Sequence, residues 1–144
     1  MTYKQVQQAV QTILRSHAMI KDVRFVTAKE WIKRDSDPVY PVCCYDIFSG
    51  SFQPGYKTFQ VRFMFLDQTG MDGEYEIDVV SDQTEIANDI VALVKQRDNN
   101  WIIDTEITFE VLLGEFEDNL SGVQLTINIK TLNNYDTCAI PYNA

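Results

Sequence analysis

Three segments of the chain, residues 57–67, 103–113 and 123–129, alternate apolar and polar side chains. Successive side chains of a β-strand point to opposite faces, so each segment predicts a strand with one apolar and one polar face. The residues expected to share the apolar face are Phe59, Val61, Phe63, Phe65, Ile103, Thr105, Ile107, Phe109, Val111, Leu113, Val123, Leu125, Ile127 and Ile129. A sheet made from these strands must cover that face with other elements of the chain.

Two segments with helical spacing provide the expected cover. Mainly apolar side chains recur every three or four positions in residues 2–19 and 82–97. This spacing predicts two amphipathic helices. The stripes consist of Tyr3, Val6, Val10, Ile13, Leu14 and His17 in the first helix and of Ile86, Ile90, Leu93 and Val94 in the second. Thr2 with Gln5, and Asp82 with Glu85, have the spacing of capping boxes at the two helix starts.

Residues 22–28 and 40–48 predict two further strands, and the segments 29–38, 49–56 and 67–79 predict connections rich in turn-forming or charged residues. The resulting order of elements is α-β-β-β-α-β-β. We therefore expect an α+β fold, with an antiparallel sheet of about five strands and two helices packed on one face. The length of 144 residues predicts that residues 1–144 form a single domain.

The charge is distributed unevenly along the chain. The net charge of −9 divides into +4 for residues 1–62 (nine basic, five acidic) and −13 for residues 63–144 (three basic, 16 acidic). An acidic chain argues against generic binding to nucleic acid or to anionic membranes, since both require a cationic surface. The asymmetry suits head-to-tail packing of identical subunits, and a solvated surface with chance imbalance explains it equally well.

Few residues carry the chemistry of catalysis. The sequence has no glycine-rich phosphate loop, no nucleophile elbow and one histidine, His17, which we expect to be half-buried and hydrogen-bonded. Cys43 and Cys44 should lie on opposite faces of a strand as small apolar side chains, and with Cys138 they match no zinc spacing. The chain shows no secretory signal and no apolar run long enough to span a membrane. We expect no catalytic residues, no metal, no cofactor and no membrane partner.

Two groups of carboxylates have spacings that could serve a divalent cation. Asp104, Glu106 and Glu110 would share one strand face, as in a Mg²⁺-dependent hydrolase, but the strand has no lysine nearby. The ordinary polar face of a one-sided sheet explains this first group better. The second group is the alternating run Asp72, Glu74, Glu76 and Asp78. Its spacing differs from that of an EF-hand, which favours a solvated loop.

Aromatic side chains are dense in the first long hairpin, and those near its tip are hard to bury within a monomer. Phe48, Phe52 and Tyr56 are therefore candidates for a partner surface, unless the loop folds back onto its own sheet. With three residues of the acidic connection they form the candidate oligomer interface. Its members are Phe48, Phe52, Tyr56, Glu74, Tyr75 and Glu76.

Short strings of residues along the chain carry a family resemblance. They are Glu-Asp-Asn-Leu-Ser-Gly-Val at 117–123, Tyr-Asp-Thr-Cys-Ala-Ile-Pro at 135–141, Tyr40-Pro41 and Ser81-Asp82. With the element order, the chain resembles small structural proteins of tailed phages, including crAss-like phages, and in particular tail-terminator and tail-completion proteins. The resemblance implies a non-enzymatic ring subunit at the head–tail junction of the virion, assembled in the bacterial cytoplasm.

The resemblance also implies partners: further copies of the chain in a hexameric or dodecameric ring, and tail-tube or portal proteins. DNA would pass through an acidic lumen without specific binding. An alternative is an acidic inhibitor that mimics DNA and binds a basic host protein, supported by the −13 of residues 63–144. The metal-dependent hydrolase based on Asp104, Glu106 and Glu110 ranks third.

Overall fold

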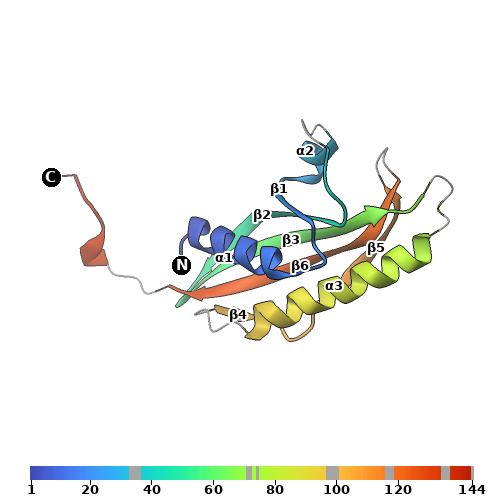
Figure 1. The fold of residues 1–144 in the computed structure, drawn as a ribbon. Coiled ribbons are helices and arrows are strands. Elements are labelled where there is room, and N and C mark those ends of the chain that lie inside the picture. The colour runs from blue at the N-terminus through green and yellow to red at the C-terminus, as the bar shows by residue number, and fades with distance from the viewer. Residues whose placement is uncertain are drawn as a thin grey trace.

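The computed structural model describes residues 1–32, 37–70, 73, 75–96, 101–115, 119–133 and 137–143 (Figure 1). These residues form an α+β fold. The helices are α1 (Tyr3–Ser16), α2 (Ala28–Ile32), α3 (Glu76–Gln96) and the short 3-10 helix η1 (Thr137–Ala139). The strands are β1 (Asp22–Phe25), β2 (Val42–Gln53), β3 (Tyr56–Gln68), β4 (Trp101–Ile103), β5 (Phe109–Glu115) and β6 (Leu120–Leu132).

The six strands form one mixed sheet in which β1, β2, β3 and β6 follow each other, and both β4 and β5 pair with β6 on its far side. All described pairings are antiparallel except β1–β2, which is parallel. The predicted α+β fold with a mainly antiparallel sheet of about five strands is therefore confirmed, and the details differ in two places, of which the parallel β1–β2 pair is the first. The chain crosses over through α2 between β1 and β2, and a crossover connection is what makes parallel pairing possible.

The second difference concerns residues 103–113, which were expected to form one strand. The structure divides them between β4, opposite residues 129–131 of β6, and β5, which begins opposite Leu125. Between these strands Ile107 packs against the core, and the Lys95 ammonium donates a hydrogen bond to the Thr105 carbonyl (3.3 Å). These contacts hold the connection between β4 and β5 toward α3 instead of along β6.

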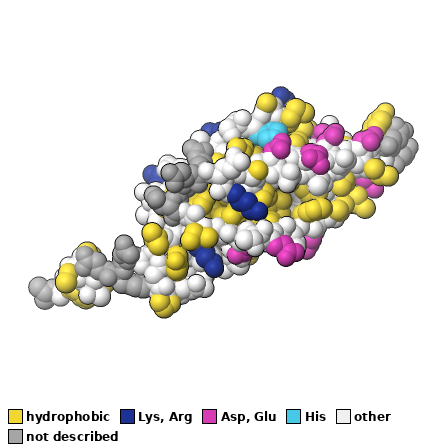
Figure 2. Space-filling view, turned by 90° about the horizontal axis from the view of Figure 1, so that it is seen from below, with side chains coloured by type: hydrophobic (Ala, Val, Ile, Leu, Met, Phe, Trp, Pro, Cys, Tyr) yellow, Lys and Arg dark blue, Asp and Glu magenta, His cyan; other side chains and the backbone are white. Residues whose placement is uncertain are grey.

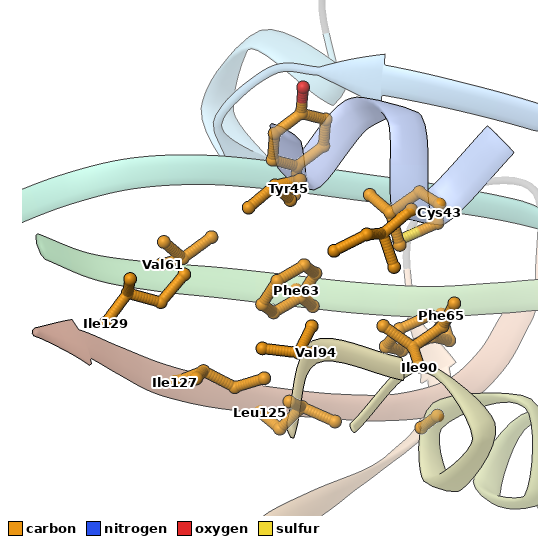
Figure 3. Packing of buried hydrophobic residues seen from close by; sticks show 14 of the residues in the cluster. Cys43, Tyr45, Val61, Phe63, Phe65, Ile90, Val94, Leu125, Ile127 and Ile129 are labelled. Atoms are coloured by element: carbon orange, nitrogen blue, oxygen red, sulfur yellow. The ribbon is translucent and has the colours of Figure 1, made fainter. Parts of the chain in front are cut away.

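The apolar face of the sheet packs against α1 and α3, as the alternation predicted. Figure 3 shows side chains from β2, β3 and β6 converging with those of α3 in this core. Its buried residues include Val6, Val10, Ile13, Leu14, Cys43, Tyr45, Val61, Phe63, Phe65, Ile86, Ile90, Val94, Val123, Leu125, Ile127 and Ile129. Removal of these side chains from water is the main favourable contribution to folding.

α1 is fastened to the sheet by a polar contact in addition to its apolar stripe. Its N-terminus carries the predicted capping box, in which Thr2 and Gln5 bond to each other's backbone N–H groups. The Tyr45 hydroxyl of β2 accepts a hydrogen bond from Gln7 Nε2 (2.9 Å) and donates one to Gln11 Oε1. Burial raises the pKa of Tyr45 to about 12, so the phenol remains a donor at neutral pH.

α3 begins six residues before the predicted start, and Asp82 and Glu85 lie inside it, so the predicted cap is wrong. The first turn instead contains Glu76 and Asp78, whose carboxylates interact favourably with the exposed N–H groups of a helix start. His17, which ends α1, is half-buried as predicted, and its Nε2 lies 2.8 Å from Asp89 Oδ2 of α3.

A smaller apolar cluster covers part of the opposite face of the sheet. α2, which the sequence reading assigned to a charged connection, places Trp31 against this face with no exposed surface. The cluster contains Trp31, Val42, Cys44, Met64, Leu66 and Leu120. Cys43 lies in the main core instead, which confirms that the adjacent cysteines occupy opposite faces.

At Gly122 the backbone of β6 lies very close to the backbone of its neighbour β3. A Cβ atom at this position would lie 1.7 Å from the Phe65 carbonyl oxygen, far inside van der Waals contact. We predict that Gly122→Ala lowers the free energy of unfolding by about 1–3 kcal/mol, because the strands must separate to admit a methyl group. Urea unfolding measures the loss.

Gly55→Asn is the matched control, because this turn glycine (φ 82°) has open space around its Cβ position and asparagine tolerates positive φ. It should remain close to wild type, and an equal loss in both variants would contradict the close-approach explanation.

Tyr45→Phe should cost about 0.5–1.5 kcal/mol, the usual net contribution of a hydrogen bond in a partly buried site. The ring stays in the core, so the loss reports the contacts with Gln7 and Gln11 alone. Thermal or urea unfolding provides the measurement, with Tyr75→Phe, an exposed tyrosine, as the control. A variant as stable as wild type would show that the apolar stripe alone positions α1.

Candidate self-association surface

Both long helices pack on the apolar face of the sheet (Figure 1). On one side the edge consists of β1 and then residues 48–53 of β2, because β1 pairs only with residues 42–45. On the other side it consists of β4 and β5. No described strand pairs with the outer side of either edge, so backbone N–H and C=O groups are exposed there for a further strand.

The order of the strands turns the charge asymmetry of the sequence into an asymmetry across the sheet. Residues 1–62, with a net charge of +4, supply α1, β1, α2, β2 and the first half of β3. Residues 63–144, with −13, supply the rest, including α3, β4, β5 and β6. Because the order is β1-β2-β3-β6-β4 with β5 beside β6, the half of the chain with positive net charge and the acidic half lie on opposite sides of the sheet.

The acidic side of the molecule has a groove of about 480 Å³ between α3 and the segment that leads into β5. Figure 2 looks onto the α3 side of the molecule and shows hydrophobic side chains gathered in a band along it, with acidic side chains beside them. The lining residues are Thr84, Glu85, Ala87, Asn88, Val91, Lys95, Thr105, Glu106, Ile107, Phe109 and Leu125.

The apolar character continues beyond the groove. Phe109, Val111 and Leu113 of β5 are each about half exposed (52%, 50% and 54%). Ile77 is 85% exposed and precedes Thr84 and Val91 by multiples of seven, so it lies on the same side of α3. We call this region the β5–α3 surface and define it by Ile77, Thr84, Asn88, Val91, Phe109, Val111 and Leu113.

The alternation in residues 103–113 identified these side chains but assigned them to a covered face. The structure leaves them exposed because α3 packs over β6 and β3, and β5 lies one strand further out. An alternating sequence pattern cannot distinguish an apolar face that a helix covers from an apolar face that stays exposed.

The predicted interface residues fall into two groups at opposite ends of the molecule. Phe52, at the tip of the β2–β3 hairpin, is 78% exposed, and Tyr56 is half-buried beside it. Phe48 is 45% exposed and stacks under the Arg62 guanidinium (4.6 Å to the ring centroid), which forms a bidentate pair with Asp46. Part of Phe48 is thus used within its own subunit.

Tyr75 and Glu76 lie at the start of α3, and β3 runs between that end and the hairpin tip (Figure 1). Tyr75 is 58% exposed, Glu76 is half-buried, and Glu74 lies outside the described residues. The five described residues therefore do not form one patch on a single copy.

The carboxylates considered for metal binding do not converge. Asp104 accepts a hydrogen bond from Asn128 (3.1 Å) in a polar recess of about 410 Å³, whereas Glu106 lines the groove on the opposite face. Glu110 lies opposite Gln124, four residues along β6 from Asn128. Glu76 and Asp78 lie in a helix rather than a loop, and Asp72 lies outside the described residues. No group of three potential ligands occurs among the described histidine, cysteine, aspartate and glutamate residues.

The chain matches no known family model, and no curated protein matches it. None of the helices in the described ranges combines the length and the apolar character needed to cross a membrane. The candidate surface is therefore defined by the geometry and charge of this chain alone.

Asp67, near the end of β3, has a carboxyl group whose pKa is raised by its surroundings. Burial raises the pKa of its carboxyl group, a hydrogen bond from the Gln68 backbone N–H (2.8 Å) lowers it, and nearby Asp82 raises it again. The net shift is upward, so the charged carboxylate is less favourable in the folded state than in the unfolded chain.

We predict that Asp67→Asn raises the free energy of unfolding at pH 7, since asparagine removes this cost and its Oδ1 can keep the Gln68 contact. The gain should disappear as the pH falls below the ordinary carboxyl pKa of 3.8, where aspartate is neutral in both states. Urea midpoints at pH 7 and pH 3 test this, and a loss of stability at pH 7 would contradict the sign.

Proposed function

We propose that this chain is a non-enzymatic subunit that associates head to tail with copies of itself. Following the family resemblance, we propose that its assembly is a ring at the head–tail junction of a tailed phage. The observation that carries the proposal is that the net-positive half and the acidic half of the chain lie on opposite sides of one sheet whose two edges have no described partner strand. A surface that is basic on one side and acidic on the other attracts a second copy in one relative orientation.

Such a contact joins two different patches and is therefore heterologous. Heterologous contacts generate a closed ring when the rotation between subunits closes, and a filament when it does not. An identical patch on both partners would instead give a twofold dimer, in which Glu85 and Glu106 beside the β5–α3 surface would face their own copies and oppose the contact. The charge distribution therefore favours repeated association over a simple dimer.

The proposed location is the virion, with assembly in the host cytoplasm and with tail-tube or portal proteins as further partners. The net charge of −9 fits a protein that surrounds DNA without holding it, because phosphate binding requires cationic side chains. In this role the chain has no catalytic residues and no cofactor.

A second candidate is an inhibitor that mimics DNA, and one feature of α3 favours it. Asp78, Asp82, Glu85 and Asp89 are exposed and follow each other at intervals of four, three and four residues. They form a single stripe about 16 Å long at a rise of about 1.5 Å per residue. A row of evenly spaced negative charges is what a phosphate-binding protein recognises.

We predict that the wild-type chain has a mass well above the 16.6 kDa of one subunit at low ionic strength, as measured by light scattering after size exclusion. Raising the salt from about 50 mM to about 500 mM should shift the distribution toward monomer, because screening weakens the attraction between the charged edges. Negative-stain images of the large species should show rings with a central hole.

A mass of one subunit at every concentration and salt tested would contradict the proposal and favour the inhibitor. The inhibitor predicts a monomer that binds a basic DNA-binding protein, is displaced by duplex DNA, and loses binding when Asp82 and Glu85 are replaced by asparagine and glutamine.

A further inference from the structure

Resting on the head-to-tail association proposed above, we infer that a second copy docks on the β5–α3 surface with the β2 side of its sheet. Residues 48–53 of β2 in one copy would pair along β5 of the next. The sheet would thus continue from subunit to subunit. The occupant of the apolar surface is a second copy of this chain, and three features of the two edges support it.

The first feature is that each segment offers several consecutive residues of strand backbone without a proline. Edge strands are usually short, charged, interrupted by proline or twisted by a bulge. Residues 49–53 of β2 contain no charged residue and stay in regular register after the shift between Ile47 and Ser49. β5 is seven residues long and carries Glu110 and Glu115, and its irregularity lies between Leu112 and Glu115. The two segments therefore offer comparable lengths of regular backbone for pairing.

The second feature is the placement of apolar side chains on one face. Phe52 lies opposite Lys57, and Phe109 lies opposite Leu125, so both phenylalanines point to the face that carries α1 and α3. In a continuous sheet this face is shared by neighbouring subunits. The hairpin tip would then bring Phe52 of one copy to the groove beside Phe109 and Val111 of the next, where it loses most of its exposed surface.

The third feature is charge complementarity at the rim. The described basic residues on the side of β1 and β2 include Lys21, Lys29 and Lys57, and Lys57 lies directly beside Phe52. The groove beside the β5–α3 surface is lined by two acidic residues, Glu85 and Glu106, and one basic residue, Lys95. Opposite charges around an apolar centre orient the approach of the two edges and oppose pairing of β5 with a second β5.

The test uses two variants that each block one side of the contact. Val111→Lys places a cation on the β5–α3 surface and should block it against a basic neighbour. Phe52→Glu removes the proposed anchor and places an anion on the β2 side. Gln96→Lys, an exposed position on the side of α3 that faces α1, and Tyr142→Glu, an aromatic with similar exposure to Phe52 (74% against 78%), are the matched controls.

Each blocked variant should have the 16.6 kDa mass of a single chain under conditions in which the wild type and both controls are assembled. A mixture of the two blocked variants should give a species of twice that mass and nothing larger. Each blocked chain keeps the side that the other lacks, so one contact forms and growth stops. Circular dichroism and thermal unfolding confirm that the variants are folded.

Cross-linking provides a second readout that does not depend on the affinity of a single contact. In a Cys138→Ser background, chains with Phe52→Cys mixed with chains carrying Val111→Cys should be joined by a short bismaleimide. Neither chain alone should cross-link to itself to the same extent, because the two positions come from different sides of the contact.

The outcomes separate the inference from the proposed function. If the wild type is monomeric, the self-association itself fails and the inference falls with it. If the wild type assembles and Val111→Lys or Phe52→Glu assembles equally well, this contact is wrong while the proposed function stands. The inference is also overturned if the mixture of Val111→Lys and Phe52→Glu chains stays monomeric and the mixture of Phe52→Cys and Val111→Cys chains does not cross-link.

Discussion

The structure depends on the burial of one apolar sheet face against two helices. β3 lies at the centre of this arrangement, paired along its length with β2 and β6, and Phe63 and Phe65 project from it into the core. Covering this face is the largest favourable term in folding, and it takes both long helices. No helix remains for the edges, which explains why the molecule has a well-packed centre and exposed margins.

The same arrangement makes the position of a residue along the chain correspond to its position across the sheet. The first half of the chain forms one side and the second half forms the other, with β3 between them. A charge imbalance in the sequence therefore appears as a difference in net charge between two sides of a sheet whose outer strands are four strand spacings apart, roughly 20 Å. In a fold whose two halves interleave in the sheet, the same sequence charges would not be separated onto two sides.

Several elements could be predicted from the sequence because their signal is local. The capping box of Thr2 and Gln5 and the alternation through β3 and β6 each depend on residues within one element, and the structure confirms them. The predictions are wrong where contacts between residues far apart in the chain determine the local structure. α2 forms because Trp31 packs into a buried site against β2 and β3. α3 starts early because the Tyr75 N–H donates to the Thr69 carbonyl (3.3 Å), and the Tyr75 carbonyl accepts the first helical hydrogen bond from Val79 (2.8 Å).

The candidate surface shows the same division. Its side chains were visible in the alternation of residues 103–113, and the hairpin-tip aromatics were singled out as exposed, which the structure supports for Phe52. The sequence could not show that Glu106 and Asp104 lie on opposite faces, or that Phe48 stacks under Arg62, because both follow from the path of the chain after β4 and from the register of β2 with β3.

The sequence by itself determined the α+β class, the apolar face of the central strands, the two covering helices and the unequal charge of the two halves. Periodicity and composition carry this information within short segments or as simple sums. Only the tertiary structure decided which apolar side chains remain exposed, that both sheet edges lack a described partner strand, and that the two unequally charged halves lie on opposite sides of the sheet. These properties depend on strand order and helix placement, which arise from contacts between residues far apart in the chain.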